Sequence, residues 1–461
     1  MARHHLPRSL RAPSVVGLAA LLPLLGCNSL GLLDVTNPDI IPTVHSASGA
    51  LALRNGVVLR LAEVTAGIGG NGPDNLFIYG GLLADEYRSG DTFVQRNDMD
   101  QRRWDPTNTF LAGPFRDLNR VRVSGASAID ALRTYAPTPA SNIGLMFAFI
   151  AFADNLAGEY YCNGIPLSSV VGTTIVYGDP IAYDSLFGLA IAEADSAVAS
   201  APATDSVSAR ARQLAWIVKG RALLNRGQFA AAAATVAQVS TTFHYDVTYS
   251  SSAGQNEIWN LNTSIKRYTV ADTEANVGLP FVSANDPRVP LATGGPVFDS
   301  AFPIISNREG IWGQFSGVSI ATGIEARLIE AEAALQAGDA TTWLNDLNVL
   351  RTNPALYPPI QSGFTRGPTL GNLTDPGTLD GRVNVMFYER AFWLFSTGHR
   401  LGDMRRLVRP TAQGGYGRPI DTVYPHGIYI KGGLYGDATM MPIPFDEQNN
   451  PKFAQCTDRN P

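Results

Sequence analysis

Apolar positions spaced three and four residues apart recur along the chain and predict a mainly α-helical protein. The first stripe begins near Ser48 and places Leu53 and Val57 on one helical face, and the glycine-rich segment 67–72 must end that helix. A second, almost wholly apolar run covers 143–153. This run is too short to span a membrane, so it predicts a helix that is buried on most sides.

Two later segments each have the pattern of two helices joined by a short turn, which is the unit of tetratricopeptide-like proteins. The first pair covers about 214–239 and the second about 324–350. In each pair a glycine, Gly227 or Gly338, stands where one helix must close with a left-handed residue. The two glycines are 111 residues apart, so we expect separate helical hairpins and not a regular solenoid.

Long insertions near 241–320 and 352–380 interrupt this helical pattern and are rich in Gly, Pro, Thr, Asn and aromatic residues. Loops of that length in a compact protein are usually functional. The predicted fold class is therefore mainly α: tetratricopeptide-like hairpins form a scaffold, with long irregular insertions and few short strands. We expect 43–461 to form a single domain.

The first 26 residues predict an export signal. Three arginines precede a 12-residue apolar run at 14–25, which is too short for a permanent membrane span. The sequence Leu24-Leu25-Gly26-Cys27 resembles the bacterial lipoprotein signal, in which the cysteine is lipidated and becomes the mature N-terminus. We expect a signal peptide at 1–26, lipid on Cys27 and a polar tether at 27–42. An ordinary signal peptide that contains a cysteine is the alternative.

Lipidation of Cys27 leaves two other cysteines, Cys162 and Cys456. Export places them in an oxidising compartment, where a pair of thiols tends to close. We therefore expect a disulfide between a mid-chain loop and the C-terminal end. Two unpaired buried thiols are the alternative.

Composition narrows the possible functions. The chain is 45% apolar and 16% charged, as in ordinary globular proteins. Its formal charge is -5, or -8 without 1–26, and only four of its 35 basic residues are lysines, so we expect no nucleic-acid binding.

The segment 67–72 has the spacing of a dinucleotide fingerprint, but it follows a predicted helix instead of a strand, so we expect no nucleotide cofactor. Histidines lack metal-ligand spacing and no Gly-x-Ser-x-Gly elbow occurs, so we expect neither a metal ion nor enzymatic activity.

The most specific signal lies in the C-terminal third. The string Phe387-Tyr388-Glu389-Arg390-Ala391-Phe392 is followed by Gly398-His399-Arg400 and by Asp403-Met404-Arg405-Arg406. It resembles the signature of the SusD/RagB family of surface nutrient-binding lipoproteins. Further motifs follow in the family's order: Asp85-Glu86, 164–167, 327–333 and 442–451. The resemblance covers essentially the whole mature chain, with two departures. The family often has Glu-Gly where this chain has Ser396-Thr397-Gly398, and its end often reads Gln-Asn-Pro-Gly where this chain has Gln455-Cys456-Thr457.

Four charged residues of this signature flank an aromatic-rich helix: Glu389, Arg390, Arg400 and Asp403. Unpaired charges beside such a helix would each cost several kcal/mol, so we expect a paired, hydrogen-bonded network. We therefore interpret these residues as structural and do not assign Glu389 and Asp403 as the acid and nucleophile of a glycosidase.

The resemblance implies an outer-membrane, surface-exposed lipoprotein that captures an oligomeric nutrient, a glycan or in some members a peptide. It also implies delivery to a SusC-like TonB-dependent transporter. Aromatic side chains on long loops offer flat faces to sugar rings. Four aromatics in polar, loop-like sequence are the candidates for ligand binding: Trp104, Trp259, Tyr268 and Trp312. The tryptophans on helical apolar patterns are expected in the core: Trp216, Trp343 and Trp393.

Two other functions are compatible with these patterns. A tetratricopeptide-like lipoprotein could be a scaffold for an outer-membrane assembly complex and bind no nutrient. A surface hydrolase would require two carboxylates about 5 to 9.5 Å apart in one groove.

Overall fold

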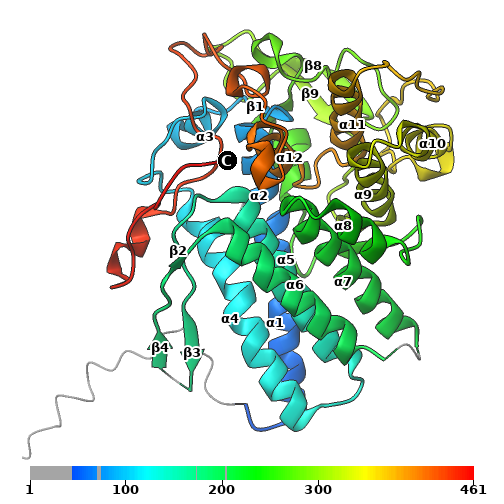
Figure 1. Ribbon diagram of the computed structural model, residues 1–461. Helices are drawn as coiled ribbons and strands as arrows, with labels where there is room; N and C mark the ends of the chain where they lie inside the picture. The colour runs from blue at the N-terminus through cyan, green and yellow to red at the C-terminus, as the bar shows by residue number, and fades with distance from the viewer. Residues whose placement is uncertain (1–43, 70–73, 173, 203–204) are drawn as a thin grey trace, which may run out of the picture. The chain divides into compact units, whose positions relative to one another are not determined.

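A bundle of long helices forms one part of the fold, and a loop-rich region with short strands forms the other (Figure 1). The computed structural model describes 44–69, 74–172, 174–202 and 205–461. The predicted signal peptide, Cys27 and the tether lie outside the described residues. The described residues belong to one compact unit.

The predicted helical segments are helices in the structure, further helices lie between them, and the mainly α fold class is confirmed. Their bounds are α1 Ala47–Thr65, α2 Leu76–Leu83, α3 Val94–Asp100, α4 Ala112–Tyr135, α5 Ser141–Tyr160, α6 Tyr183–Ser200, α7 Ser206–Asn225, α8 Phe229–Val236, α9 Gly323–Gln336, α10 Ala340–Arg351, α11 Leu379–Trp393 and α12 Arg400–Val408. Short turns of 3-10 helix are η2 Glu274–Asn276, η3 Pro354–Leu356, η4 Thr411–Gln413, η5 Ile420–Thr422 and η6 Phe445–Asn449, and η1 Trp259–Ser264 is a π-helical turn.

Neighbouring helices in the bundle pack in chain order: α1 on α4, α4 on α5, α5 on α6, α6 on α7, and so on to α10. Two predicted hairpins are α7 with α8 and α9 with α10, and each turns at the expected glycine. Gly227 and Gly338 have φ angles of 70° and 78°, which side chains with a Cβ rarely adopt. The second glycine is followed by Asp339, whose side chain accepts the Thr342 N–H and caps α10.

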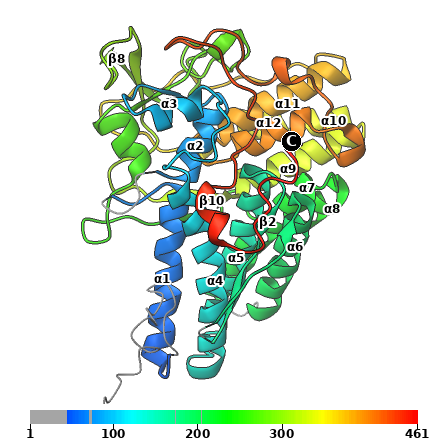
Figure 2. The same cartoon turned by 90° about the vertical axis from the view of Figure 1, so that its left-hand side faces the viewer.

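Helix α5 is the predicted buried helix. Among the described residues it alone has the length and apolar composition of a membrane span, but 94% of its apolar window is buried inside the protein. Helices α4, α6 and α7 all contact it, and Figure 2 shows it within the bundle. Its apolar sequence is therefore explained by a position in the core.

Strands in the described residues pair only two at a time, all antiparallel. The ladders are β1 Tyr87–Ser89 with β7 Tyr268–Val270, β2 Ile165–Pro166 with β5 Pro180–Ile181, β3 Ser169–Val171 with β4 Thr174–Val176, β6 His244–Val247 with β10 Val318–Thr322, and β8 Leu291–Pro296 with β9 Ile305–Glu309. Five of these ten strands, β6 to β10, lie in or at the edge of the predicted insertion 241–320. This insertion builds much of the loop-rich region.

Candidate functional site

The charged residues of the signature lie in the core at the junction between helices and loops. Arg400 donates from Nε and NH2 to the two carboxylate oxygens of Asp85, at 2.5 and 2.9 Å. Glu389 accepts from Arg288 NH1 at 2.6 Å and also pairs with Arg351. These contacts join α11 and α12 to distant loops, in agreement with the expected structural role.

A second part of this network surrounds Asp403, which lies on α12 and is buried. Arg390 Nε and Arg406 NH2 donate to its two oxygens at 2.8 and 2.7 Å, and Arg406 also pairs with Glu332. Burial would raise the pKa of Asp403, but the two guanidinium groups hold it well below its ordinary value. The cluster contains two guanidinium groups and two carboxylates, so it is electrically balanced.

Ser396, at the position where the sequence departs from the family pattern, explains one wrong prediction. Its hydroxyl accepts from the Tyr87 hydroxyl at 2.6 Å and from Trp312 Nε1 at 3.0 Å, and it donates to Glu309 at 3.3 Å. Trp312 is therefore held in the core with its indole N–H satisfied, and only 6% of it is exposed. The expectation that Trp312 lies on an open loop is wrong.

The expectation that Tyr268 is exposed is also wrong, since this side chain is fully buried. It begins the short strand β7, and all three residues of this strand are buried. Tyr268 points inward beneath Arg96, whose guanidinium carbon lies 5.7 Å from the ring centroid, whereas the preceding Arg267 reaches the surface. The neighbouring Arg267 is partly exposed, with 18% of its side chain accessible.

The remaining predicted aromatics lie in different surroundings. Trp104 is half-buried, and Arg459 covers one ring face with its guanidinium carbon 4.1 Å from the ring centroid. Trp259 is half-buried in η1. Trp343 and Trp393 are buried as predicted, but Trp216 is only half-buried, because it packs at the edge of the core beneath Arg212.

An exposed aromatic surface does exist, and it is built from residues that the sequence patterns did not single out. Phe93 and Phe298 are 44% and 47% exposed, and Arg267 lies against both rings. The Arg267 guanidinium carbon is 5.1 Å from the Phe93 centroid and 4.0 Å from the Phe298 centroid. We call Phe93, Arg267 and Phe298 the aromatic platform.

Buried charges fix the aromatic platform from below. Asp91 is fully buried and accepts from Arg267 NH1 at 2.5 Å and from Arg96 NH1 at 2.7 Å. Arg96 also donates to Asp74 at 2.9 Å. Burial opposes the charge on Arg96, yet Tyr268 and Asp74 raise its pKa above the ordinary value, so the guanidinium stays charged. The buried Asp91 carboxylate thereby holds Arg267 against the two rings.

Lys431 joins the platform to the C-terminal part of the chain. Its Nζ donates to the Asp91 carbonyl at 2.5 Å, to Asn97 Oδ1 at 3.1 Å and to Asp299 Oδ2 at 3.0 Å. The same ammonium lies 5.3 Å from the Phe302 ring centroid. Segments near residues 91, 267, 298 and 431 are therefore fixed together, so a ligand would meet a preorganised surface.

Phe93 and Phe298 could have been found by the criterion used for the four predicted binding residues, which is an aromatic side chain in loop-like sequence. Phe93 follows Gly90-Asp91-Thr92, and Phe298 lies between Gly294-Gly295-Pro296 and Asp299, so both occur in turn-forming sequence without helical periodicity. The sequence did not indicate Arg267, because its role depends on two rings that are distant in the chain.

A cavity of about 410 Å³ lies near the end of α11 and is lined in part by Trp312, Trp393 and Tyr357. Both indoles are more than nine-tenths buried, so the cavity offers little ring face for stacking. No cluster of three or more His, Cys, Asp or Glu that could hold a metal occurs among the described residues. The aromatic platform is therefore the better candidate site for an extended ligand.

Solved structures resemble this fold over nearly its full length. A SusD superfamily protein from Parabacteroides distasonis has 14% sequence identity and a TM-score of 0.63, with 90% of this chain and 100% of that chain covered. A SusD homolog from Bacteroides thetaiotaomicron also has 14% identity and a TM-score of 0.63, covering 89% and 97%. A SusD-like carbohydrate binding protein from Bacteroides fragilis has 14% identity and a TM-score of 0.62, covering 88% and 99%.

These likenesses concern the fold, since sequence identity is only 14%. No protein-family model and no curated protein matches the sequence. The fold is nevertheless that of the SusD superfamily, as the signature around Glu389 and Arg400 predicted.

Proposed function

We propose that this protein is a surface-exposed outer-membrane lipoprotein that captures an oligosaccharide on the aromatic platform. It then delivers the oligosaccharide to a SusC-like TonB-dependent transporter. The observation that carries the proposal is the pair of exposed rings, Phe93 and Phe298, both in contact with the Arg267 guanidinium. The likeness to a SusD-like carbohydrate binding protein supports the choice of ligand, and the predicted lipid on Cys27 supports the location.

The geometry suits a sugar chain for two reasons. A pyranose ring has apolar faces that pack on aromatic rings, and its hydroxyls at the edge need donors and acceptors. Arg267 supplies donors next to the two rings, and Asp299 and Asn97 lie close by through their contacts with Lys431. Two rings on separate segments favour an oligomer over a single sugar.

Calorimetry of the exported domain against a panel of oligosaccharides and peptides tests the ligand assignment. We expect F298A and F93A each to weaken oligosaccharide binding about five- to thirty-fold, which corresponds to roughly 1 to 2 kcal/mol per stacked ring. Matched controls are F445A and F315A, since these phenylalanines are similarly exposed and lie outside the platform. Equal affinities in all four variants would remove the platform as the binding site.

A separate experiment tests the partner. The full lipidated protein, purified from gently solubilised outer membranes, should bring with it a large TonB-dependent barrel. Recovery of an outer-membrane assembly complex without such a barrel would favour the scaffold function instead.

A further inference from the structure

Backbone hydrogen bonds join the three segments that form the aromatic platform. The Phe298 N–H donates to the Lys266 carbonyl at 2.9 Å, and the Gly90 N–H donates to the Arg267 carbonyl at 2.8 Å. The Asp299 N–H donates to the Gly90 carbonyl at 2.7 Å. Lys266 has a φ of 56°, a left-handed conformation that costs free energy in residues other than glycine and persists only where other contacts hold it. The backbone of Lys266 is therefore fixed at the platform, directly beside Phe298.

Lys266 differs from the other lysines of the chain because it has no counterion. The ammonium groups of Lys219, Lys431 and Lys452 each lie within 3.0 Å of a carboxylate oxygen. No carboxylate of the described residues pairs with Lys266, and its side chain is partly exposed. A free ammonium beside an exposed ring can form a charge-assisted hydrogen bond with an anionic group of a ligand.

Arg267 presents an unused hydrogen-bonding edge at the same place. Its NH1 donates to Asp91, but Nε and NH2 have no acceptor in the described part of the chain, and both atoms reach the surface. The guanidinium carbon lies 4.0 Å from the Phe298 ring centroid. Nε and NH2 together form the planar fork that binds a carboxylate through two parallel hydrogen bonds. This edge therefore fits the carboxylate of a ligand that lies on the Phe298 ring.

The carboxylates closest to the platform are already neutralised within the protein. Asp91 is fully buried and pairs with Arg267 and Arg96, and Asp299 pairs with Lys431. The chain as a whole is acidic, so the attraction of an anionic ligand must be local. At physiological ionic strength exposed charges are largely screened beyond about 8 Å, so distant carboxylates oppose such a ligand only weakly.

We propose that the platform binds an acidic oligosaccharide, in which a uronic acid ring packs on Phe298 while its carboxylate accepts from Nε and NH2 of Arg267 and pairs with the Lys266 ammonium. This inference rests on the capture of an oligosaccharide in the proposed function and names the class of that oligosaccharide. A uronic acid suits both parts of the site, because its pyranose ring has an apolar face and its carboxylate projects from the ring edge.

Calorimetry of the exported domain compares acidic probes with neutral counterparts of the same backbone. The probes are hexasaccharides of galacturonate, mannuronate, guluronate and hyaluronan, each tested beside its methyl ester, in which the carboxylate charge is removed. Hydrogen bonds to charged groups are roughly twice as strong as neutral ones, so we expect at least one acid to bind about tenfold more tightly than its ester. Raising the salt from about 0.1 to 1 M should weaken binding of the acid and leave binding of the ester unchanged.

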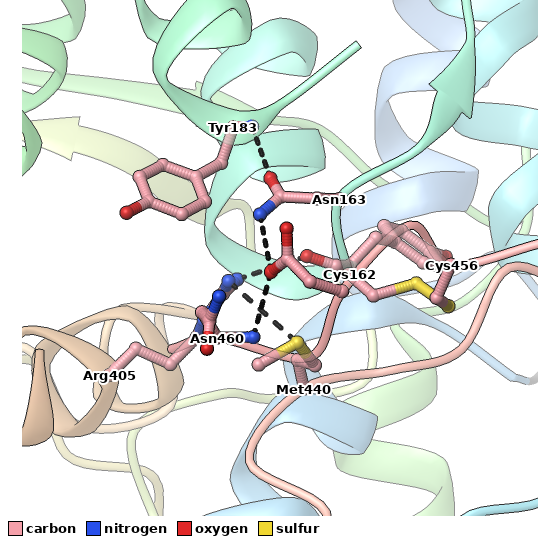
Figure 3. The surroundings of a disulfide bond; sticks show 9 residues. Cys162, Asn163, Tyr183, Arg405, Met440, Cys456 and Asn460 are labelled. Carbon is pink, nitrogen blue, oxygen red and sulfur yellow. Dashed lines mark hydrogen bonds between the residues drawn. A yellow bond between two sulfur atoms is a disulfide. The ribbon is translucent and has the colours of Figure 1, made fainter. Parts of the chain in front are cut away.

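Lys266→Gln removes the free ammonium and keeps most of the length of the side chain. We expect K266Q to weaken binding of the acid about three- to tenfold and to leave binding of the ester within about twofold. The matched control is K452Q, because Lys452 pairs with Asp179 and has no contact with the platform. The predicted disulfide between Cys162 and Cys456 is present and ties the segment of Lys452 to the helical part of the chain (Figure 3). Both variants therefore change one charge on a fixed backbone, and K452Q should bind the acid as the parent does.

Arg267→Lys tests the fork separately from the charge. Lysine keeps a positive charge next to Asp91 but cannot form two parallel hydrogen bonds with a planar carboxylate. We expect the ratio of acid affinity to ester affinity to fall about fivefold in R267K. Melting curves of all variants show whether each one is folded, and K266Q tests the proposal independently of Arg267.

The outcomes separate this inference from the proposed function. If every ester binds as tightly as its acid, and F298A weakens that binding, the acidic class is wrong and the platform stands. If no acid and no ester binds, both the acidic class and the oligosaccharide ligand are wrong. Equal affinities of K266Q and K452Q for the acid would overturn the role of Lys266. Tighter binding of hexaglutamate than of every oligosaccharide would make the ligand an acidic peptide.

Discussion

Replacing Asp403 by asparagine removes one of two carboxylates that neutralise two buried guanidinium groups. Asp403 accepts from Arg390 at 2.8 Å and from Arg406 at 2.7 Å, and all three side chains are at least nine-tenths buried. Asparagine has nearly the same shape, but it carries no charge and presents only one acceptor oxygen. In the variant, Glu332 is the only carboxylate left in the cluster to balance Arg390 and Arg406. One positive charge therefore stays buried without compensation.

Removal of one partner from a buried ion pair costs about 3 to 5 kcal/mol, because the other charge stays buried. Stability changes of this size shift melting temperatures by about 2 to 4 °C per kcal/mol in domains of 150–250 residues and by less in larger ones. For D403N we therefore expect a decrease of roughly 3 to 10 °C. Oligosaccharide affinity below the melting transition should remain unchanged, since the platform has no contact with Asp403.

The matched control is D380N. Asp380 pairs with Arg418 at 2.9 Å, but its side chain is 82% exposed, and exposed pairs contribute little to stability. Melting curves by circular dichroism, recorded with calorimetry on the same samples, separate the two variants. If D403N melts with the control, the signature network is not the source of stability that the geometry implies. If D403N keeps its fold but loses oligosaccharide binding, the signature belongs to the binding site.

Three further predictions concern the anchor, the disulfide and the buried glutamates. Cys27→Ser should release the protein from outer membranes of cells that lack the transporter, as measured by fractionation, and retention there would contradict lipidation. Replacing Cys162 and Cys456 by serine opens a connection across 294 residues and should destabilise the protein by on the order of 5 kcal/mol at most, with earlier proteolysis of the C-terminal segment. Burial raises the pKa of Glu86 and Glu309 from 4.5 to about 8, so their protons are bound more tightly in the folded protein. Their stabilising effect is complete below about pH 4.5 and is lost as the pH rises to about 8, so melting temperatures should fall over this range, and less steeply in E309Q.

Candidate binding residues show where sequence patterns are sufficient and where they fail. The criterion of a loop aromatic without helical periodicity is met by Phe93 and Phe298 as well as by Trp312. The criterion cannot tell which rings the core will take, because that choice depends on distant partners. Ser396 satisfies the Trp312 indole from the other end of the chain, and no local pattern indicates this contact.

The sequence by itself determined the mainly α fold class and the two helical hairpins. Apolar spacing and turn glycines are local signals, and these were enough to place the hairpins that close at Gly227 and Gly338. The tertiary structure alone decided which side of each loop meets water. Tyr268 and Arg267 are neighbours in the chain, but Tyr268 is buried in the core whereas Arg267 lies partly exposed against two distant rings. Arg267 reaches Phe93 and Phe298 only because folding brings three distant loops together, and that proximity is absent from any local pattern of residues.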